Sequence, residues 1–243
     1  MVRTPAPLVT PVVDSMRLDL QYHKARSGGD FFDALTIGDS RLVFLMMDIA
    51  GQRTGAMDLA ARVQDEFRIR TPELFKGIVN ESNALSEHCL HLNRTILGAA
   101  GRARMTAAFL GVLHSDVGTL TYINAGHVPG LLLAANSTEF LESTGLPLGL
   151  FSHATHEACF RVLPRGGALL MVSRGVVEAR TDSGVLDYIG RSSEFGAAGV
   201  LKATANVPLR AQLLCRAVLD SAIAHAGRHI DNDMSVAAIS RDA

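Results

Sequence analysis

The sequence lacks several features that would assign its class at once. Its three cysteines, Cys89, Cys159 and Cys215, are odd in number and widely spaced, so neither a disulfide framework nor a zinc site of C-x-x-C pairs is predicted. No apolar run reaches the ~18 residues of a membrane span, and residues 1–11 lack the basic and apolar segments of a secretory signal. We therefore expect a cytoplasmic protein with reduced thiols and no membrane contact.

An excess of charge of one sign is also missing. The formal net charge is −1, and the lysines and arginines are scattered rather than clustered. This excludes the basic face that a nucleic acid or an acidic membrane would require. A composition that is 48% hydrophobic and 19% charged indicates a globular chain with a buried core. We expect one domain over residues 1–243, with its core at about residues 17–241.

The order of the apolar patterns predicts an α+β fold. Residues 17–22, 31–37 and 42–49 have the pattern of strands, the last two joined by a turn at 38–40. Helical spacing follows at residues 56–67, Pro72 interrupts it, and a second amphipathic helix is expected over 74–96. A late helix opens at Pro208, and the remaining strands are expected at 105–113, 119–124, 130–133, 159–162, 168–172 and 234–239. This order favours antiparallel sheets covered by helices.

Common catalytic templates are not found. The chain has no G-x-x-x-x-G-K-[ST] phosphate loop and no G-x-S-x-G nucleophile elbow. His88 and His91 lie three residues apart on a predicted helix, and His225 and His229 flank Gly227. Either pair could hold a metal, but no third ligand at suitable spacing joins them, so ordinary helix and loop histidines are expected.

Two aspartates stand at the ends of apolar segments. Asp30 follows Gly28 and Gly29 directly, and Asp48 closes the run over residues 42–47. A carboxylate at the end of a buried strand is costly unless it is paired, hydrogen-bonded or bound to a cation. Spacing alone leaves two interpretations open: a capping or ion-pair role, or two carboxylates that face each other across one divalent ion.

Six short motifs stand in order along the chain. They are Gly28-Gly29-Asp30-Phe31-Phe32-Asp33, Met47-Asp48-Ile49-Ala50-Gly51, Asn124-Ala125-Gly126-His127-Val128-Pro129, Ser143-Thr144-Gly145-Leu146-Pro147-Leu148-Gly149, Val172-Ser173-Arg174-Gly175-Val176-Val177-Glu178-Ala179 and Asn232-Asp233-Met234-Ser235-Val236. They resemble G-G-D-F-Y-D, G-D-V-S-G, N-A-G-H-x-P, S-x-G-x-P-L-G, Y-T-D-G-V-x-E-A and D-D/N-x-T/S-x of the sporulation-type (SpoIIE-like) branch of the PPM/PP2C metal-dependent phosphatases. The resemblance runs from about residue 22 to residue 240, nearly the whole chain.

The resemblance implies a four-layer αββα sandwich with a binuclear Mg²⁺ or Mn²⁺ centre between the sheets. In that family a metal-bound water attacks a phosphoserine or phosphothreonine. The usual substrates in this branch are phosphorylated anti-sigma antagonist proteins of partner-switching pathways. Carried over by position, Asp30 corresponds to a ligand of one ion and Asp48 to the carboxylate that bridges both. The backbone carbonyl of Ile49 would be a further ligand.

Two positions depart from the family pattern. Arg174 and Asn232 stand where the family has metal-ligating aspartates. Because a guanidinium beside a divalent ion is strongly unfavourable, Arg174 is expected to turn away, to pair with Asp30 or Asp48, or to bind a phosphate itself. Asp231 or Asp233 could replace Asn232 after a shift of one residue, although neighbouring strand residues point to opposite faces.

These departures leave two functions open. The first is a weakened protein serine/threonine phosphatase, with one or two ions, that acts on a phosphorylated regulatory protein. The second is a pseudophosphatase that binds a phosphoprotein or an anti-sigma factor, with one ion or none and no hydrolysis. Arg174 and Asn232 discriminate between them, because an active relative should carry acidic residues at both positions.

Overall fold

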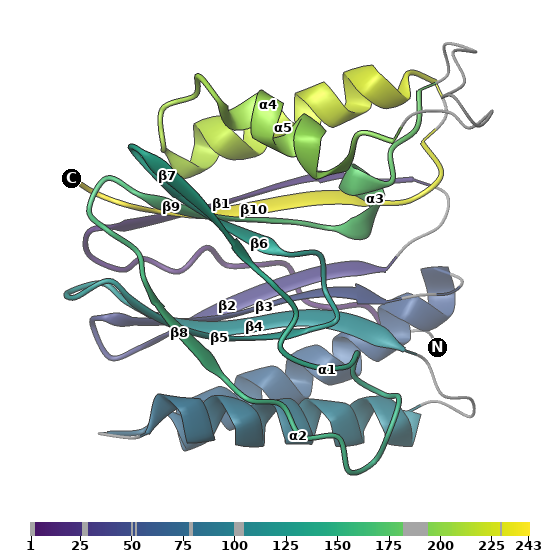
Figure 1. Cartoon of the computed structure of the whole chain (residues 1–243). Helices are drawn as coiled ribbons and strands as arrows, with labels where there is room; N and C mark the ends of the chain where they lie inside the picture. Colours follow the sequence, from purple (N-terminus) through teal and green to yellow (C-terminus); the bar gives the residue numbers. More distant parts are fainter. Residues whose placement is uncertain are drawn as a thin grey trace.

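The computed structural model describes residues 3–25, 29–49, 51, 53–77, 80–99, 105–181, 194–228 and 230–243. Two five-stranded sheets face each other, and every neighbouring pair of strands is antiparallel (Figure 1). One sheet has the order β1 (Met16–His23), β10 (Met234–Arg241), β9 (Ala168–Val172), β6 (Gly130–Ala134) and β7 (Ser137–Leu141). The other has the order β2 (Asp30–Ile37), β3 (Arg41–Ile49), β4 (Thr106–His114), β5 (Thr119–Ala125) and β8 (Cys159–Val162).

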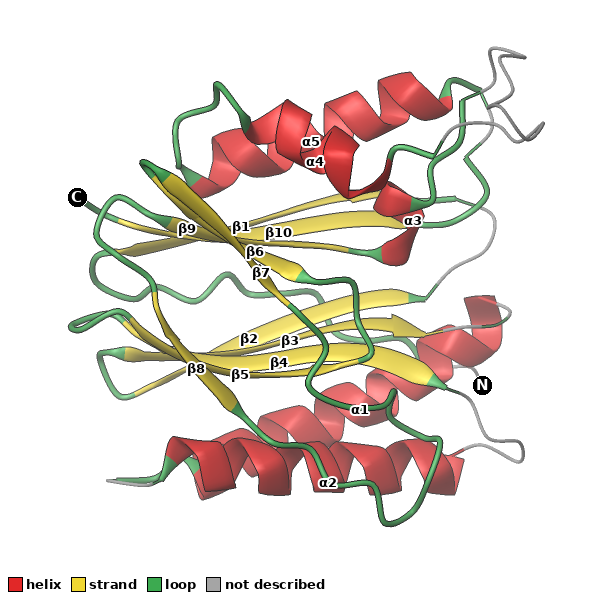
Figure 2. Ribbon diagram, viewed as in Figure 1, coloured by secondary structure: helices red, strands yellow, loops and turns green. Residues whose placement is uncertain are grey.

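Helices cover the outer face of each sheet (Figure 2). The long helices α1 (Arg53–Leu74) and α2 (Glu81–Ala99) pack on the β2–β3–β4–β5 side. On the other sheet, α5 (Ala211–Ala226) packs on β1, β10 and β9 and carries α4 (Gly196–Thr204) beside it, while the short α3 (Arg174–Val177) lies against β10. The predicted four-layer αββα sandwich is confirmed.

Three apolar layers hold these four layers together. One lies between α1, α2 and their sheet, one between the two sheets, and one between the second sheet and α4 and α5. Strand β3 contributes to two of them, because Val43, Leu45 and Met47 face the helices whereas Phe44 and Met46 face the other sheet. Burial on both faces explains why β3 is apolar throughout rather than alternating.

The same alternation decides where polar residues at the strand ends point. Phe32 and Ala34 of β2 and Phe44 and Met46 of β3 lie in the layer between the sheets. Asp30 and Asp48 continue these series two residues further on, so their side chains also lie between the sheets. The fold thus brings both carboxylates to one end of the sandwich.

Several elements differ from the sequence-based expectation. Helix α1 continues through Pro72 to Leu74, and α2 begins only at Glu81, so Leu74 belongs to the first helix. A proline near a helix end removes one donor, and here the buried Phe67 and Thr71 keep the last turn packed. Strand β7 and the helices α3 and α4 were not predicted, and α5 begins at Ala211, after Pro208. Among the described residues, no helix is long and apolar enough to cross a membrane.

Candidate functional site

The two predicted carboxylates are direct neighbours across the β2–β3 hairpin. Asp30 and Asp48 are Cα partners in the antiparallel register, at the end of the hairpin opposite its turn. Because both face the second sheet, they lie where that sheet supplies Ser173 after β9 and Ser235 in β10. The site is therefore built from both sheets, as the alternation of apolar residues requires.

Arg174 forms an ion pair with Asp48. Its Nε lies 3.2 Å from Oδ2 of Asp48, so of the alternatives expected for this arginine the structure has the pairing with Asp48. The Arg174 side chain is 52% exposed, whereas that of Asp48 is 11% exposed. A longer contact of 3.9 Å reaches Glu178 within the same short helix. The guanidinium thus sits at the mouth of the site, with its contact to Asp48 directed inward.

Asp30 faces the hydroxyl groups of Ser173 and Ser235 across the space between the sheets. Burial, and to a lesser degree the nearby carboxylates of Asp48 and Asp233, raises the pKa of Asp30 to about 7, although these two hydroxyl groups act to lower it. Its Oδ2 atom is buried and has no hydrogen-bond partner among the residues described.

Close backbone approaches fix the loops around these carboxylates. A Cβ atom on Gly29 would lie 2.7 Å from the carbonyl oxygen of Ile49 and 2.5 Å from Cβ of Ala56. A Cβ on Gly175 would lie 2.0 Å from the carbonyl oxygen of Asp233. Glycine is needed at both positions because no larger residue fits. These contacts set the backbone that carries Asp30 and Arg174.

Asp233 lies in a separate hydrogen-bond network at the same end of the sandwich. Its side chain is fully buried, and Arg53 Nη2 lies 2.6 Å from its Oδ1. Tyr22 donates its hydroxyl to Oδ2 at 2.7 Å, and the backbone N–H of Ala25 donates to Oδ1 at 2.8 Å. Burial raises the pKa of Tyr22 to about 12, so its hydroxyl remains a donor at neutral pH. Both oxygens of Asp233 therefore already have protein partners.

A small cleft adjoins the two substituted family positions. It has a volume of about 200 Å³ and is lined by Gly175, Glu178, Ala179, Arg180, Ile230, Asp231, Asn232 and Met234. Asn232 lines this cleft and is exposed, next to the buried Asp233. Within the described ranges, no group of three or more His, Cys, Asp or Glu side chains is arranged to hold a metal ion.

The histidines have structural surroundings. His88 is buried between α1 and α2, with its Nε2 2.9 Å from the Thr71 hydroxyl, and burial lowers its pKa to about 4. His91 faces Glu66 at 3.6 Å. His127 donates from Nδ1 to the Val128 carbonyl at 3.0 Å and is buried. The pair of His225 and His229 cannot be compared, because His229 lies outside the described residues.

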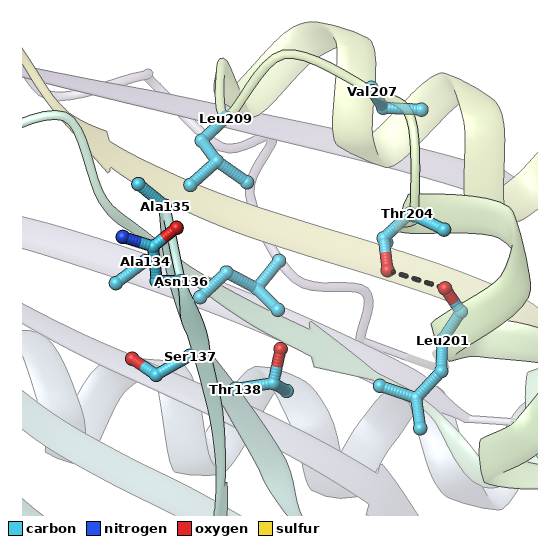
Figure 3. A pocket seen from close by; sticks show the side chains of 11 residues that line it. Ala134, Ala135, Asn136, Ser137, Thr138, Leu201, Thr204, Val207 and Leu209 are labelled. Carbon is cyan, nitrogen blue, oxygen red and sulfur yellow. Dashed lines mark hydrogen bonds between the residues drawn. The ribbon is translucent and has the colours of Figure 1, made fainter.

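A second hollow lies away from the carboxylates. It has a volume of about 440 Å³ and lies between the β6–β7 turn and the segment that joins α4 to α5 (Figure 3). Its lining is apolar or uncharged, and Thr204 donates its hydroxyl to the Leu201 carbonyl at 3.0 Å inside it. No charged side chain lines this hollow, in contrast to the carboxylate end of the sandwich.

Comparison with known proteins decides the family. The family model for Stage II sporulation protein E (SpoIIE) matches residues 38–242, which is most of the chain and includes five of the six motifs. This chain belongs to the SpoIIE family. The predicted resemblance is confirmed, and this SpoIIE-family chain shares its two facing sheets with PP2C-type phosphatases.

Three relatives show how widely the similarity extends. Protein IcfG of Synechocystis sp. (strain ATCC 27184 / PCC 6803 / Kazusa) is 26% identical over 206 residues, which cover 76% of this chain and 32% of IcfG. Phosphoserine phosphatase RsbU of Bacillus subtilis (strain 168) is 29% identical over 99 residues, 40% of this chain and 30% of RsbU. The crystal structure of the RsbU and RsbW domains of Rv1364c from Mycobacterium tuberculosis has a TM-score of 0.78 at 26% identity, covering 97% of this chain and 64% of that one.

The chain thus spans about a third of the length of the two curated relatives. A more distant structure, the catalytic domain of the serine/threonine protein phosphatase PstP in complex with two manganese ions, has a TM-score of 0.64 at 12% identity, covering 94% of this chain and 99% of that one. That likeness concerns the fold alone.

The sequence identified some of these site residues and missed others. Asp30 and Asp48 lie side by side in the hairpin, and Arg174 pairs with Asp48. Ser173 and Ser235 were not assigned a role, although each lies two residues from an inward-facing residue of its strand, Met171 of β9 and Ala237 of β10, by the same period that places the aspartates. The contact of Arg53 with Asp233 joins residues 180 positions apart, so no local sequence pattern predicts it.

Proposed function

We propose that this chain is a SpoIIE-like domain that recognises a phosphorylated regulatory protein of a partner-switching pathway, with a degenerate metal centre and weak or lost hydrolysis. The ion pair of Arg174 with Asp48 carries the proposal. Asp48 stands at the position that bridges two ions in the family, and here its counter-ion is a protein side chain. The name of the relative RsbU, a phosphoserine phosphatase, supports the class of phosphorylated partner.

Electrostatics supports a degenerate centre. A guanidinium about 4 Å from a divalent ion would be repelled by roughly 8 kcal/mol at an effective dielectric constant near 20, and solvent around the half-exposed Arg174 would reduce this figure. Asn232 is neutral where the family has a carboxylate. Asp233 has protein partners at both oxygens. We infer that the residues present do not fit a two-ion centre.

Arg174 also supports recognition of a phosphate. A guanidinium binds a phosphoryl group through paired, charge-assisted hydrogen bonds. Arg174 is half exposed at the mouth of the site and adjoins the cleft lined by Arg180 and Asn232. A phosphoserine that enters this cleft would replace Asp48 as the partner of Arg174. The carboxylates of Asp30 and Asp48 would repel the phosphate dianion and so limit how deeply it enters.

A one-ion phosphatase is the second candidate. Oδ2 of Asp30, which has no hydrogen-bond partner within the described part of the chain, and the Ile49 carbonyl beside Gly29 are oxygen atoms of the kind that Mg²⁺ and Mn²⁺ prefer. If Arg174 leaves Asp48, these groups could hold a single Mg²⁺ or Mn²⁺ ion. This candidate requires hydrolysis by the wild-type chain, whereas recognition alone does not.

Two assays on the same protein separate the candidates. Calorimetry with O-phospho-L-serine should show binding by the wild type, and Arg174→Gln should weaken it at least about tenfold, because a paired contact to a charge is lost. Arg216, whose side chain is 78% exposed, is the control: Arg216→Gln removes the same charge elsewhere and should leave binding unchanged. Hydrolysis of 4-nitrophenyl phosphate with Mn²⁺ should stay at background. Turnover by the wild type, together with unchanged phosphoserine binding in Arg174→Gln, would refute the proposal.

A further inference from the structure

The carboxylate end of the sandwich contains a second arginine besides Arg174, namely Arg53. Asp30 and Asp48 are Cα partners across the β2–β3 hairpin, and the backbone carbonyl of Asp233 lies 3.5 Å from the hydroxyl of Ser173, at the same end of the sandwich. Two of these three carboxylates have a guanidinium as partner, Arg174 on Asp48 and Arg53 on Asp233. Only one negative charge of the cluster therefore lacks a protein counter-ion among the described residues. The cluster is balanced almost completely by the chain itself.

Arg53 is positioned more firmly than Arg174. It is the first residue of α1, and its side chain is 24% exposed, less than half the value of Arg174. Its Nη2 donates to Asp233 at 2.6 Å and to the Ala25 carbonyl at 2.7 Å. These contacts join the start of α1, on one sheet, to the segment after β1 and the segment before β10, on the other sheet. Arg53 is thus a fixed positive charge within the site.

We infer that Arg53 lowers the affinity of the carboxylate cluster for divalent cations, by balancing Asp233 with a fixed charge that repels an incoming ion. The inference deepens the proposed degenerate centre, and it names a residue besides Arg174 and Asn232 that keeps metal away. A divalent ion in the cluster would meet two positive side chains instead of one. Repulsion between the Arg53 guanidinium and a divalent ion in the same carboxylate cluster should lower the affinity for that ion by at least about tenfold.

The helix α1 provides a matched control. Arg68, fifteen positions after Arg53, pairs with the fully buried Asp33 at 2.7 Å, and its side chain is 33% exposed. Asp33 is three residues after Asp30 in β2, so its side chain lies on the opposite face of the sheet, toward the helices. Removing the charge of Arg68 therefore breaks a similar buried pair in the same helix, but away from the cluster.

The test measures Mn²⁺ affinity of the full chain from the electron paramagnetic resonance signal of unbound Mn²⁺. Arg53→Gln, which keeps polar donors and loses the charge, should bind Mn²⁺ at least about tenfold more tightly than the wild type. Arg53→Lys, which keeps the charge, and Arg68→Gln should both remain within about threefold of the wild type. A merely structural role for Arg53 would not separate Gln from Lys in this way.

Two results would overturn the inference: Arg53→Gln binding Mn²⁺ no more tightly than the wild type, or Arg68→Gln gaining as much as Arg53→Gln. If Arg53→Gln does not fold, Arg53→Met decides, because it keeps the apolar stem and removes the charge; Mn²⁺ must then bind about tenfold more tightly than to the wild type, and unchanged affinity would contradict the inference. Its failure is distinct from failure of the proposed function, which rests on phosphoserine binding and hydrolysis by the wild type.

Discussion

The buried ion pair of Asp33 with Arg68 leads to a prediction about the stability of the fold. Asp33 is fully buried and receives Nε of Arg68 at 2.7 Å and Nη2 at 3.1 Å. Arg68→Met would keep the aliphatic stem and leave this carboxylate without its partner. Breaking a buried pair costs about 3–5 kcal/mol, and we expect the lower end because a third of the Arg68 side chain reaches solvent. For a chain of this size the melting temperature should fall by roughly 6–12 °C.

Urea unfolding of Arg68→Met, Asp33→Asn and the double variant measures the pair directly. The double variant should cost less than the sum of the single variants by at least about 1 kcal/mol, because the two residues act together. Mn²⁺ affinity should not change, since Asp33 faces the helices rather than the other sheet. A cost below about 1 kcal/mol for Arg68→Met, or additive single variants, would refute the reasoning.

Two further predictions concern the backbone and the pH dependence. Gly175→Ala should destabilise the chain by roughly 2 kcal/mol or more in urea unfolding, because its Cβ would lie 2.0 Å from the Asp233 carbonyl oxygen; a neutral effect would contradict this packing. The pKa of His88 is about 4 in the folded chain, below its ordinary value of 6.5, so only the unfolded chain takes up this proton between those pH values. Stability should therefore fall by about 3 kcal/mol as pH drops from 6.5 to 4, and His88→Gln should flatten that part of the curve. An unchanged slope in His88→Gln would show that other groups cause the loss.

The strands and helices could be predicted from the sequence where their packing produces a local pattern of apolar residues. Strand β3 could be predicted because both of its faces are buried, and β10 for the same reason. Strand β7 escaped prediction because four of its five residues are exposed at the edge of its sheet, so it shows no apolar period. Pro72 appeared to end a helix that packing continues to Leu74.

The site was predictable in part for a similar reason. Asp30 and Asp48 close two strands of one hairpin, so their proximity follows from the register. The partner of Arg174 was one of several alternatives, and only the tertiary structure selects Asp48. The Arg53–Asp233 pair depends on how α1 enters beside the opposite sheet, which no short segment encodes. Whether Asp233 or Ile49 ligates a metal stays a prediction.

The most direct test of the degenerate centre is the stoichiometry of metal binding. Calorimetry with Mn²⁺ and with Mg²⁺ on the wild type should show at most one weakly bound ion. Arg174→Asp/Asn232→Asp, which restores both acidic positions and removes the partner of Asp48, should bind ions more tightly and gain hydrolysis of 4-nitrophenyl phosphate. Two tightly bound ions in the wild type would contradict the account, because the charges of Arg174 and Arg53 would then not exclude metal from the site.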